Sequence, residues 1–408
     1  MHPIIKALKH HKTAAVLLTL EIALTLAIVA NALLVIGDRL GSMTVTTGLP
    51  DAELVSAKVS GTDPGISASE WEARTRADLA ALRGIPGVES VANVNSVPLS
   101  PTGYTQLCLY LKPGSTDHLC GVALYAGSPG YFATLGLRVL QGRNFTEGDH
   151  VRFDLFAVDP GAPPPVIVSR SMADRLWPGE NPLGKPVYFD KDGIRVSRVV
   201  GVSGHLLNPV LAGDPAKDDL NLLMPVLDVH DGRFVLRVRP GMADRVAAML
   251  PRVLAASDDR LVINKVQPLA ETVHDYFRDD RALVWLLLGV IASLLALTGF
   301  GIFGLTGFWV QERVRVIGIR RALGATRTDI RTYFQMENLA IVTGGAALGA
   351  IMAWSLNLWL MLRYELPRLP LLPVAGGVLL VYAIGQLAVL QPSLRACRVP
   401  PQAAVRQA

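Results

Sequence analysis

Four long apolar stretches and one large polar block constrain this chain more than any other feature. The stretches are approximately residues 13–36, 282–310, 339–362 and 371–390. A helix needs about 20 apolar residues to cross the hydrocarbon core of a bilayer, and each stretch reaches that length. The polar block, residues 37–281, is far too long to be a loop between two spans. The sequence therefore predicts an α-helical membrane protein with four transmembrane helices and one sizeable extramembrane domain.

The composition favours the same class of protein. Half of the 408 residues are hydrophobic and only 18% are charged, which is too apolar for an ordinary soluble protein. The net charge of +5 is modest. We therefore expect the lipid bilayer, and no nucleic acid, among the partners of the chain.

Basic residues predict the orientation in the membrane. The leader 1–12 and the tail 391–408 contain lysine or arginine and no acid, and the segment 311–338 is rich in arginine. Lysine and arginine mark the cytoplasmic side of short membrane-flanking segments. With four spans these three segments lie on one side, so we expect both termini in the cytoplasm and the block 37–281 outside it. The motif Ala30-Asn31-Ala32 also fits a signal-peptide cleavage site, but the apolar run continues past it and favours a retained anchor.

The polar block shows a weak internal repeat of strand, helix and strand. The first copy covers residues 52–59, 69–82 and 88–94, and the second covers 234–238, 242–255 and 261–266. This pattern predicts an α+β domain in which 52–98 and 230–267 form one βαβ-repeat subdomain. Short strand-like runs between Pro and Gly clusters predict an inserted β-rich subdomain over 99–229. The amphipathic segment 268–281 is expected to form a stalk that leads into the second span.

Several residues in the apolar stretches indicate how the helices pack. Glu21 is costly inside a membrane, so we expect it to contact another helix or subunit, with a proton relay as the alternative. Asn31 could add a hydrogen bond between helices. Small residues favour close helix packing, within one chain or between two chains of a dimer; they are Gly299, Gly304, Gly345 and Gly349.

No cofactor site, metal site or catalytic constellation is predicted for this chain. Residues 299–304 fit G-x-G-x-x-G, but they lie inside an apolar stretch and follow no strand. Residues 179–186 resemble a phosphate-binding loop, but Pro186 replaces the required Ser or Thr. Cys108 and Cys120 fall in the outer domain, where they could form a disulfide or remain two buried thiols.

The segment 311–332 (QERVRVIGIRRALGATRTDIRT) is the most informative short stretch. We expect a short surface helix, a helix end at Gly324, and a new helix capped by Thr326 or Thr328. The alternative is a basic loop that touches only lipid headgroups. Within it, residues 315–325 (RVIGIRRALGA) resemble the signature of the MacB-like/FtsX-like permease family of ABC transport systems. Val316 stands where that family usually has Glu. Residues 78–91, 128–145, 166–185 and 392–405 also resemble family segments.

The resemblance implies a four-span permease of the bacterial inner membrane. It implies a MacB-like periplasmic core domain over 37–281, an FtsX-like permease domain over 282–402, and a cytoplasmic coupling loop over 311–338. The implied partners are a cytoplasmic ABC ATPase dimer that holds ATP and Mg, and a second copy of the permease or a related one. A periplasmic adaptor and an outer-membrane channel are further candidates.

In such a complex the chain is not itself an enzyme but relays ATP-driven motion to its periplasmic domain for efflux. The residues implied in contact with the ATPase are Arg313, Arg315, Ile317, Gly318, Ile319, Arg320, Arg321, Leu323, Gly324 and Arg327. Other functions remain open at this point: an FtsX-like regulator of periplasmic cell-wall hydrolases, a lipoprotein-extracting permease, and a membrane enzyme.

Overall fold

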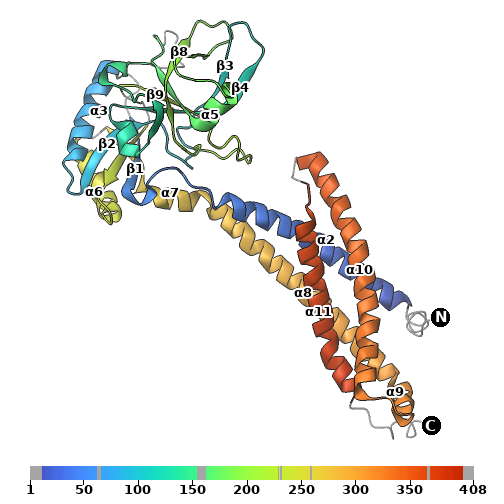
Figure 1. Cartoon of the computed structure of the whole chain (residues 1–408). Coiled ribbons are helices and arrows are strands. Elements are labelled where there is room, and N and C mark those ends of the chain that lie inside the picture. The colour runs from blue at the N-terminus through green and yellow to red at the C-terminus, as the bar shows by residue number, and fades with distance from the viewer. Residues whose placement is uncertain are drawn as a thin grey trace. The chain divides into compact units, whose positions relative to one another are not determined.

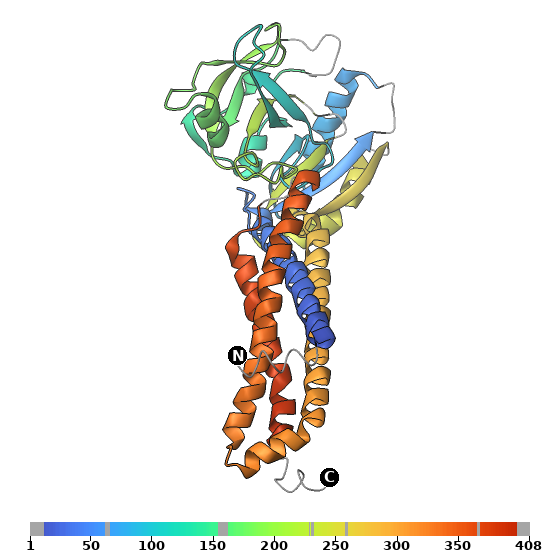
Figure 2. The same cartoon turned by 90° about the vertical axis from the view of Figure 1, so that its right-hand side faces the viewer.

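The computed structural model divides the chain into two compact units. It describes residues 12–61, 66–153, 162–227, 229, 232–257, 260–364 and 368–397, so the leader 1–11 and most of the tail lie outside the described residues. The first unit contains the residues up to Met43 and those from Asp279 onward, and we call it the membrane unit. The second, which we call the outer unit, is Thr44–Arg278. Figures 1 and 2 show the elements of each.

The described part of the membrane unit contains four long helices that are apolar enough to cross a membrane. They are α2 (Lys12–Ser42), α8 (Arg278–Glu312), α10 (Arg327–Tyr364) and α11 (Leu371–Ala396). All four extend past the predicted apolar stretches at one end or at both. At about 1.5 Å per residue, the 35 residues of α8 cover about 52 Å. The hydrocarbon core is about 30 Å thick, so α8 is long enough to project beyond it.

Helix α2 is the central helix of this unit. Half of its most apolar window is buried, more than in the other three long helices. The glycines of α10 allow α2 to approach closely. A Cβ at Gly345 would lie 2.5 Å from Cγ2 of Ile22, and a Cβ at Gly349 would lie 2.7 Å from the Ala23 carbonyl oxygen. The G-x-x-x-G pattern therefore serves packing within the chain.

Hydrogen bonds between helices add to this packing. Thr25 of α2 and Thr298 of α8 are joined by a buried bond of 2.9 Å. Asn31, which we expected to bond between helices, donates to the Ala353 carbonyl of α10 at 3.3 Å. In the same way, Asn338 of α10 donates to the Gly385 carbonyl of α11 at 2.9 Å.

The other polar and small residues singled out in the sequence occupy different surroundings. Glu21 lies against α8, where a Cβ at Gly301 would be 3.1 Å from its Oε2. Gly299 faces Ile384 of α11, at 3.3 Å from the corresponding Cβ position. Gly304 has open space within 4 Å, so it packs no helix of the described chain.

In the described residues of the outer unit, eleven strands form one sheet. The strands are β1 (Leu54–Gly61), β2 (Val88–Val94), β3 (Gln106–Tyr110), β4 (His118–Gly127), β5 (Val139–Gly142), β6 (Val166–Ser169), β7 (Pro186–Tyr188), β8 (Val196–Ser203), β9 (Asn221–Pro225), β10 (Arg233–Val238) and β11 (Leu261–Pro268). Their order is β11-β1-β10-β2-β4-β3-β7-β8-β6-β9, with β5 beside β8. Because β4 also pairs with β9, the strands from β4 to β9 close into a ring. Its interior is an apolar core that includes Leu109, Val122 and Val168.

The first and last strands of the outer unit lie together in the order β11-β1-β10-β2. Both β1 and β2 run antiparallel to β10, so β10 separates the two strands that flank helix α3 (Ala68–Arg83). Helix α6 (Ala243–Ser257) connects β10 to β11. Leu82 of α3 and Leu250 of α6 share one core with Phe234 of β10, so both helices cover the same face of the sheet. The chain segments near the two ends of the block therefore meet in one layer.

The segment 268–281, which we predicted to form a stalk, contains a helix and the start of a second one. Helix α7 (Leu269–Tyr276) ends before α8 begins at Arg278, and Phe277 between them is not helical. The Phe277 side chain is buried and makes an edge-to-face contact with Tyr276. Asp279 and Asp280 occupy the first turn of α8, where negative charge favours a new helix start. The chain thus enters the second span through two helices that are joined at Phe277.

Candidate functional site

The segment between α8 and α10 has an ordered structure. Helix α9 (Val314–Ala322) follows Arg313, and the chain then turns at Gly324, which has a φ of 99°. A positive φ of this kind favours glycine. Thr326 begins α10: its Oγ1 accepts from the Asp329 amide at 3.2 Å, and its own amide donates to Asp329 at 2.9 Å. This reciprocal capping fixes the direction in which α10 starts.

One side of α9 is anchored to the membrane unit. Ile317 is buried, and Arg313 forms an ion pair of 2.8 Å with Glu337 of α10, whose side chain is only 3% exposed. Arg320 lies over the ring of Tyr333 at 4.9 Å. An ion pair whose carboxylate is almost fully buried is costly to break, so α9 is held against α10 and not free in solvent.

A neighbouring side of α9 is exposed and combines apolar and basic residues. Leu323 is 84% exposed, Val316 51% and Ile319 46%. These three positions are spaced by three and four residues, so they share one helical face. Arg315 and Arg327 are exposed as well. We call these five residues the α9 surface.

The structure thus divides the ten residues predicted to contact a partner into two groups. The α9 surface includes Arg315, Ile319, Leu323 and Arg327, and Arg320 and Gly324 are exposed beside it. Arg313, Ile317, Gly318 and Arg321 instead lie toward the protein, and Arg321 donates to the Cys397 carbonyl at 3.3 Å. Sequence reasoning missed Glu337 and Tyr333 as anchors. A lone acid at the start of the third apolar stretch was the available signal for Glu337.

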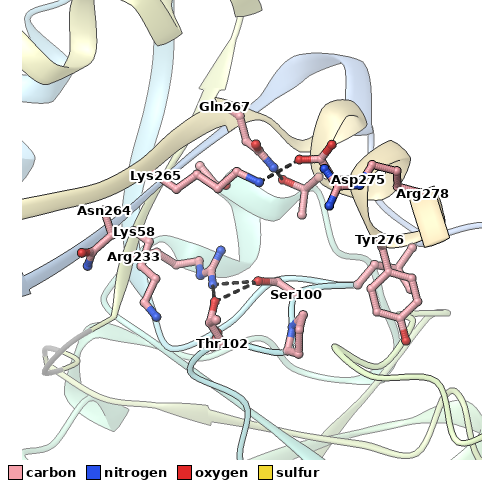
Figure 3. A pocket seen from close by; sticks show the side chains of 14 residues that line it. Lys58, Ser100, Thr102, Arg233, Asn264, Lys265, Gln267, Asp275, Tyr276 and Arg278 are labelled. Carbon is pink, nitrogen blue, oxygen red and sulfur yellow. Dashed lines mark hydrogen bonds and ion pairs between the residues drawn. The ribbon is translucent and has the colours of Figure 1, made fainter.

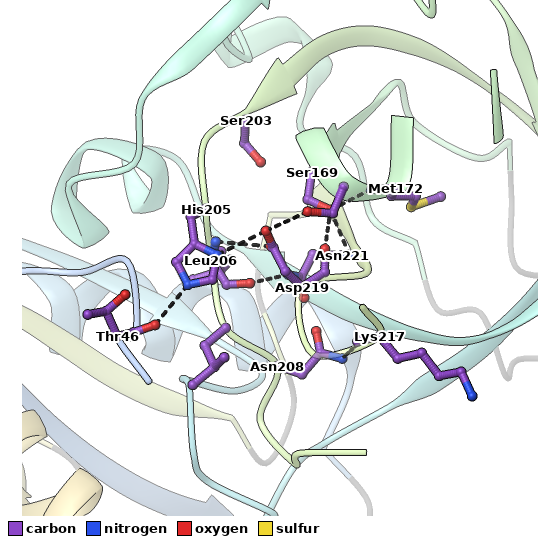
Figure 4. A network of polar contacts seen from close by, with 12 residues as sticks. Thr46, Ser169, Met172, Ser203, His205, Leu206, Asn208, Lys217, Asp219 and Asn221 are labelled. Carbon is purple, nitrogen blue, oxygen red and sulfur yellow. Dashed lines mark hydrogen bonds and ion pairs between the residues drawn. The ribbon is translucent and has the colours of Figure 1, made fainter. Parts of the chain in front are cut away.

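The outer unit contains a polar network that sequence reasoning also missed (Figure 4). Nδ1 of His205 lies 2.9 Å from Oδ2 of Asp219, and Nε2 lies 2.8 Å from the Thr46 carbonyl oxygen. The hydrogen bond to Asp219 raises the pKa of His205. The Leu206 amide donates to Oδ1 of the same carboxylate at 3.1 Å. Because both ring nitrogens face acceptors, His205 has none available to deprotonate a nucleophile. The network ties the chain segment after α2 to the sheet.

Cys108 and Cys120 are joined by a disulfide across β3 and β4. His118 lies beside them, and the three side chains form a cluster that could hold a metal ion. The disulfide occupies both sulfurs, so in this state only the histidine retains a ligand atom.

The nucleotide-like pattern at 299–304 lies within α8. It therefore lacks the loop at a helix start that phosphate binding requires.

These features define a class of protein: a multi-pass membrane protein with a large extramembrane domain and an exposed helical surface beside its membrane helices. Comparison with known families makes the assignment specific. Residues 17–253 match the MacB-like periplasmic core domain, and residues 288–401 match the FtsX-like permease C-terminal domain. The first match covers more than half of the chain. The chain belongs to the MacB/FtsX family of ABC transporter permeases.

Individual relatives agree with the family. The chain is 25% identical over 320 residues to the uncharacterized ABC transporter permease YvrN of Bacillus subtilis (strain 168), covering 73% of this chain and 74% of that protein. It is 27% identical over 243 residues to the macrolide export ATP-binding/permease protein MacB of Aggregatibacter actinomycetemcomitans, covering 56% of this chain and 34% of that one. The crystal structure of the periplasmic region of MacB from Actinobacillus actinomycetemcomitans matches with a TM-score of 0.35 and 19% identity, covering 58% of this chain and 98% of that one.

Proposed function

We propose that this chain is the transmembrane permease subunit of an ABC-type efflux or mechanotransmission complex. In this proposal a separate cytoplasmic ATPase binds ATP and Mg, and the permease converts its movement into a conformational change of the periplasmic domain. The chain lies in the bacterial inner membrane with both termini in the cytoplasm. It pairs with a second copy or a related permease, and a periplasmic adaptor and an outer-membrane channel complete the export route.

The α9 surface is the observation that carries this proposal. It presents Val316, Ile319 and Leu323 to solvent between exposed arginines, while the other side of the helix is fixed by the Arg313–Glu337 pair. Exposed apolar side chains that are rigidly held and ringed by charge are typical of a protein-docking surface. The name of the MacB relative, an ATP-binding/permease protein, supports an ATPase as the partner.

The coupling step follows from how α9 is held. A displacement of a docked ATPase acts on α9, and the ion pair to Glu337 passes it to α10. Helix α10 packs closely on α2 through Gly345 and Gly349. Closely packed helices move as rigid bodies instead of deforming. In this way a push at α9 becomes a movement of α2, whose chain continues into the outer unit.

The test is a Leu323→Asp substitution in the full-length chain. Leu323 is 84% exposed, so its replacement leaves the core intact while it places a charge in the docking surface. We expect the variant to insert in the membrane normally but to lose co-purification of an ABC ATPase, identified by mass spectrometry and by its ATP hydrolysis. Leu140→Asp, a half-exposed leucine on β5 of the outer unit, is the matched control. Undiminished capture and stimulation of the ATPase by the Leu323 variant would refute the docking assignment.

A further inference from the structure

A cavity of about 730 Å³ lies on one face of the sheet in the outer unit (Figure 3). Its floor comes from β1, β10 and β11, on the face opposite to α3 and α6. Its walls come from the loop 99–102 and from α7. The lining includes Lys58, Ser100, Thr102, Arg233, Lys265 and Asp275. None of these residues belongs to the α9 surface or to the membrane unit.

Arg233 is the most unusual residue of this cavity. Its side chain is on β10, and the residue is only 5% exposed. Nη2 donates to Ser100 Oγ and Thr102 Oγ1, both at 2.7 Å, and to the Thr102 carbonyl at 2.9 Å. Its Nε is buried and has no hydrogen-bond partner. Within the described chain, no carboxylate forms an ion pair with Arg233.

A buried guanidinium without a counter-ion is energetically costly. Burial lowers the pKa of Arg233 to about 10, so the group is still charged at neutral pH. The three acceptors on Nη2 are neutral oxygens, which satisfy hydrogen bonds but do not compensate the charge. A bound anion would compensate it and could also accept from the free Nε.

The charges around the cavity favour the same kind of ligand. Lys58 lies on the cavity floor, and it has no ion-pair partner among the residues that the structure describes. Among the described residues that line the cavity, Asp275 is the one carboxylate, and Lys265 engages it at 2.7 Å. Arg278 adds a further cation to the rim. Lys58 and Arg233 are thus two cations that face the cavity without a carboxylate partner among the described residues, which suits a doubly charged oxyanion better than a single carboxylate.

The loop 99–102 supplies the Ser100 and Thr102 hydroxyls of the cavity wall, and hydrogen bonds to its backbone hold it in place. Leu99 has a φ of 56°, and its side chain is buried. Its amide donates to the Asn208 carbonyl at 3.3 Å, and Ser96 Oγ donates to the Ser100 carbonyl at 3.3 Å. Ser100 and Thr102 are therefore positioned before a ligand arrives, which lowers the entropic cost of binding.

We propose that this cavity binds the phosphate group of a small organic ligand, with Arg233 and Lys58 as the anion-binding residues. The volume exceeds what a phosphate alone needs, so the remainder accommodates an organic substituent. The phosphate could be that of a soluble ester or that of a lipid headgroup. The proposal does not depend on the ATPase partner.

Binding is measured by isothermal titration calorimetry on the full-length chain in detergent. The probes are glycerol 3-phosphate for a soluble ester, dihexanoyl phosphatidic acid below its micellar concentration for a lipid headgroup, and succinate for a carboxylate. We expect at least one phosphate probe to bind and succinate to bind more weakly. The phosphate probe that binds more tightly identifies the source of the group.

Lys58→Gln is the main variant because Lys58 is only partly buried, and we expect it to weaken binding by about tenfold or more. Lys191→Gln, an exposed lysine outside the cavity, should bind like the unmodified chain. Arg233→Lys keeps a buried cation but removes the planar fork, so it should also weaken binding. The proposal is overturned if neither phosphate probe binds at millimolar concentration, or if Lys58→Gln leaves the affinity unchanged.

Discussion

Single side chains in the outer unit show how local hydrogen bonding sets the response of the chain to pH. His205 lies between a carboxylate and a backbone carbonyl, and both of these groups only accept hydrogen bonds. A neutral imidazole carries one N–H and can satisfy one of them, whereas the imidazolium satisfies both. The raised pKa of His205 reflects this preference for the protonated form.

The stabilising effect of His205 should therefore depend on pH. The folded-state pKa of His205 lies above its unfolded value, so the protonated side chain contributes fully below the unfolded pKa of about 6.5. This contribution is lost as the pH rises through the folded-state value. We expect His205→Ala to lower the thermal unfolding midpoint of the purified chain clearly at pH 5.5 and by less at pH 8.5. His118→Ala, at the exposed start of β4, is the control. An equal loss at both pH values would contradict this account.

At the scale of whole elements, the contact between α2 and α10 depends on residues without side chains. The Cβ positions at Gly345 and Gly349 overlap atoms of Ile22 and Ala23, so any larger residue must push the two helices apart. Gly304 on α8 offers a contrast, because nothing lies within 4 Å of its Cβ position. Glycines in the apolar stretches are therefore not equivalent, although the sequence presents them alike.

This contrast predicts the outcome of a matched pair of substitutions. Gly345→Leu should destabilise the membrane unit by about 1–3 kcal/mol or more, because overpacking forces backbone shifts. Gly304→Leu should leave the stability of the individual chain nearly unchanged. Thermal unfolding of both variants in detergent, with size-exclusion chromatography to check dispersity, measures the difference. If Gly345→Leu were as stable as Gly304→Leu, the close approach of α2 and α10 would be wrong.

For the whole molecule, the membrane orientation decides which surfaces meet which partners. In the orientation that we propose from the basic flanking segments, the α9 surface faces the cytoplasm and the outer unit lies on the opposite side of the bilayer. The proposed ATPase and the proposed phosphate ligand therefore act in different compartments. Because one chain reaches both compartments, the ATPase and the phosphate ligand need not contact each other.

Thiol labelling can test this arrangement. In a Cys397→Ser background, Leu323→Cys should react with a membrane-impermeant maleimide only after the inner membrane is opened. Leu140→Cys should react in intact spheroplasts, and the disulfide-bonded Cys108 and Cys120 should stay unlabelled. Labelling of both introduced cysteines from the same side would rule out the four-span arrangement.

Some of these features could be predicted from the sequence and others could not. Apolar length alone located all four long helices, because crossing a bilayer requires a minimum number of residues. Gly324 and Thr326 carry local signals, and the turn and the helix start occur at those positions. The break at Phe277 was missed because residues 275–280 (DYFRDD) contain neither Gly nor Pro to mark a helix end. The pairing of His205 with Asp219 depends on strand connections that no local pattern reveals.

The residues of the proposed phosphate cavity could not be predicted from the sequence, for a structural reason. Lys58 and Arg233 are far apart in the chain and meet only because β1 pairs with β10 in a fixed register, which places Lys58 directly opposite Arg233. Neither residue stands out by itself, since each is one basic residue in a strand. Long-range register is a tertiary property, and periodicity within a strand does not determine it.

The pairing of β1 with β11 has a mechanical consequence for the connections to the membrane. Strand β1 follows the chain from α2, β11 leads toward α8, and Val55 lies opposite Pro268 at the end of this antiparallel ladder. The two chain segments that lead to α2 and to α8 therefore leave the sheet at the same end. If α2 and α8 shift together, the outer unit can follow without losing a backbone bond. If α2 and α8 are pulled apart, the backbone hydrogen bonds between β1 and β11 break first beside Val55 and Pro268. A force that separates the two helices would therefore begin to unfold the outer unit at this end of the sheet.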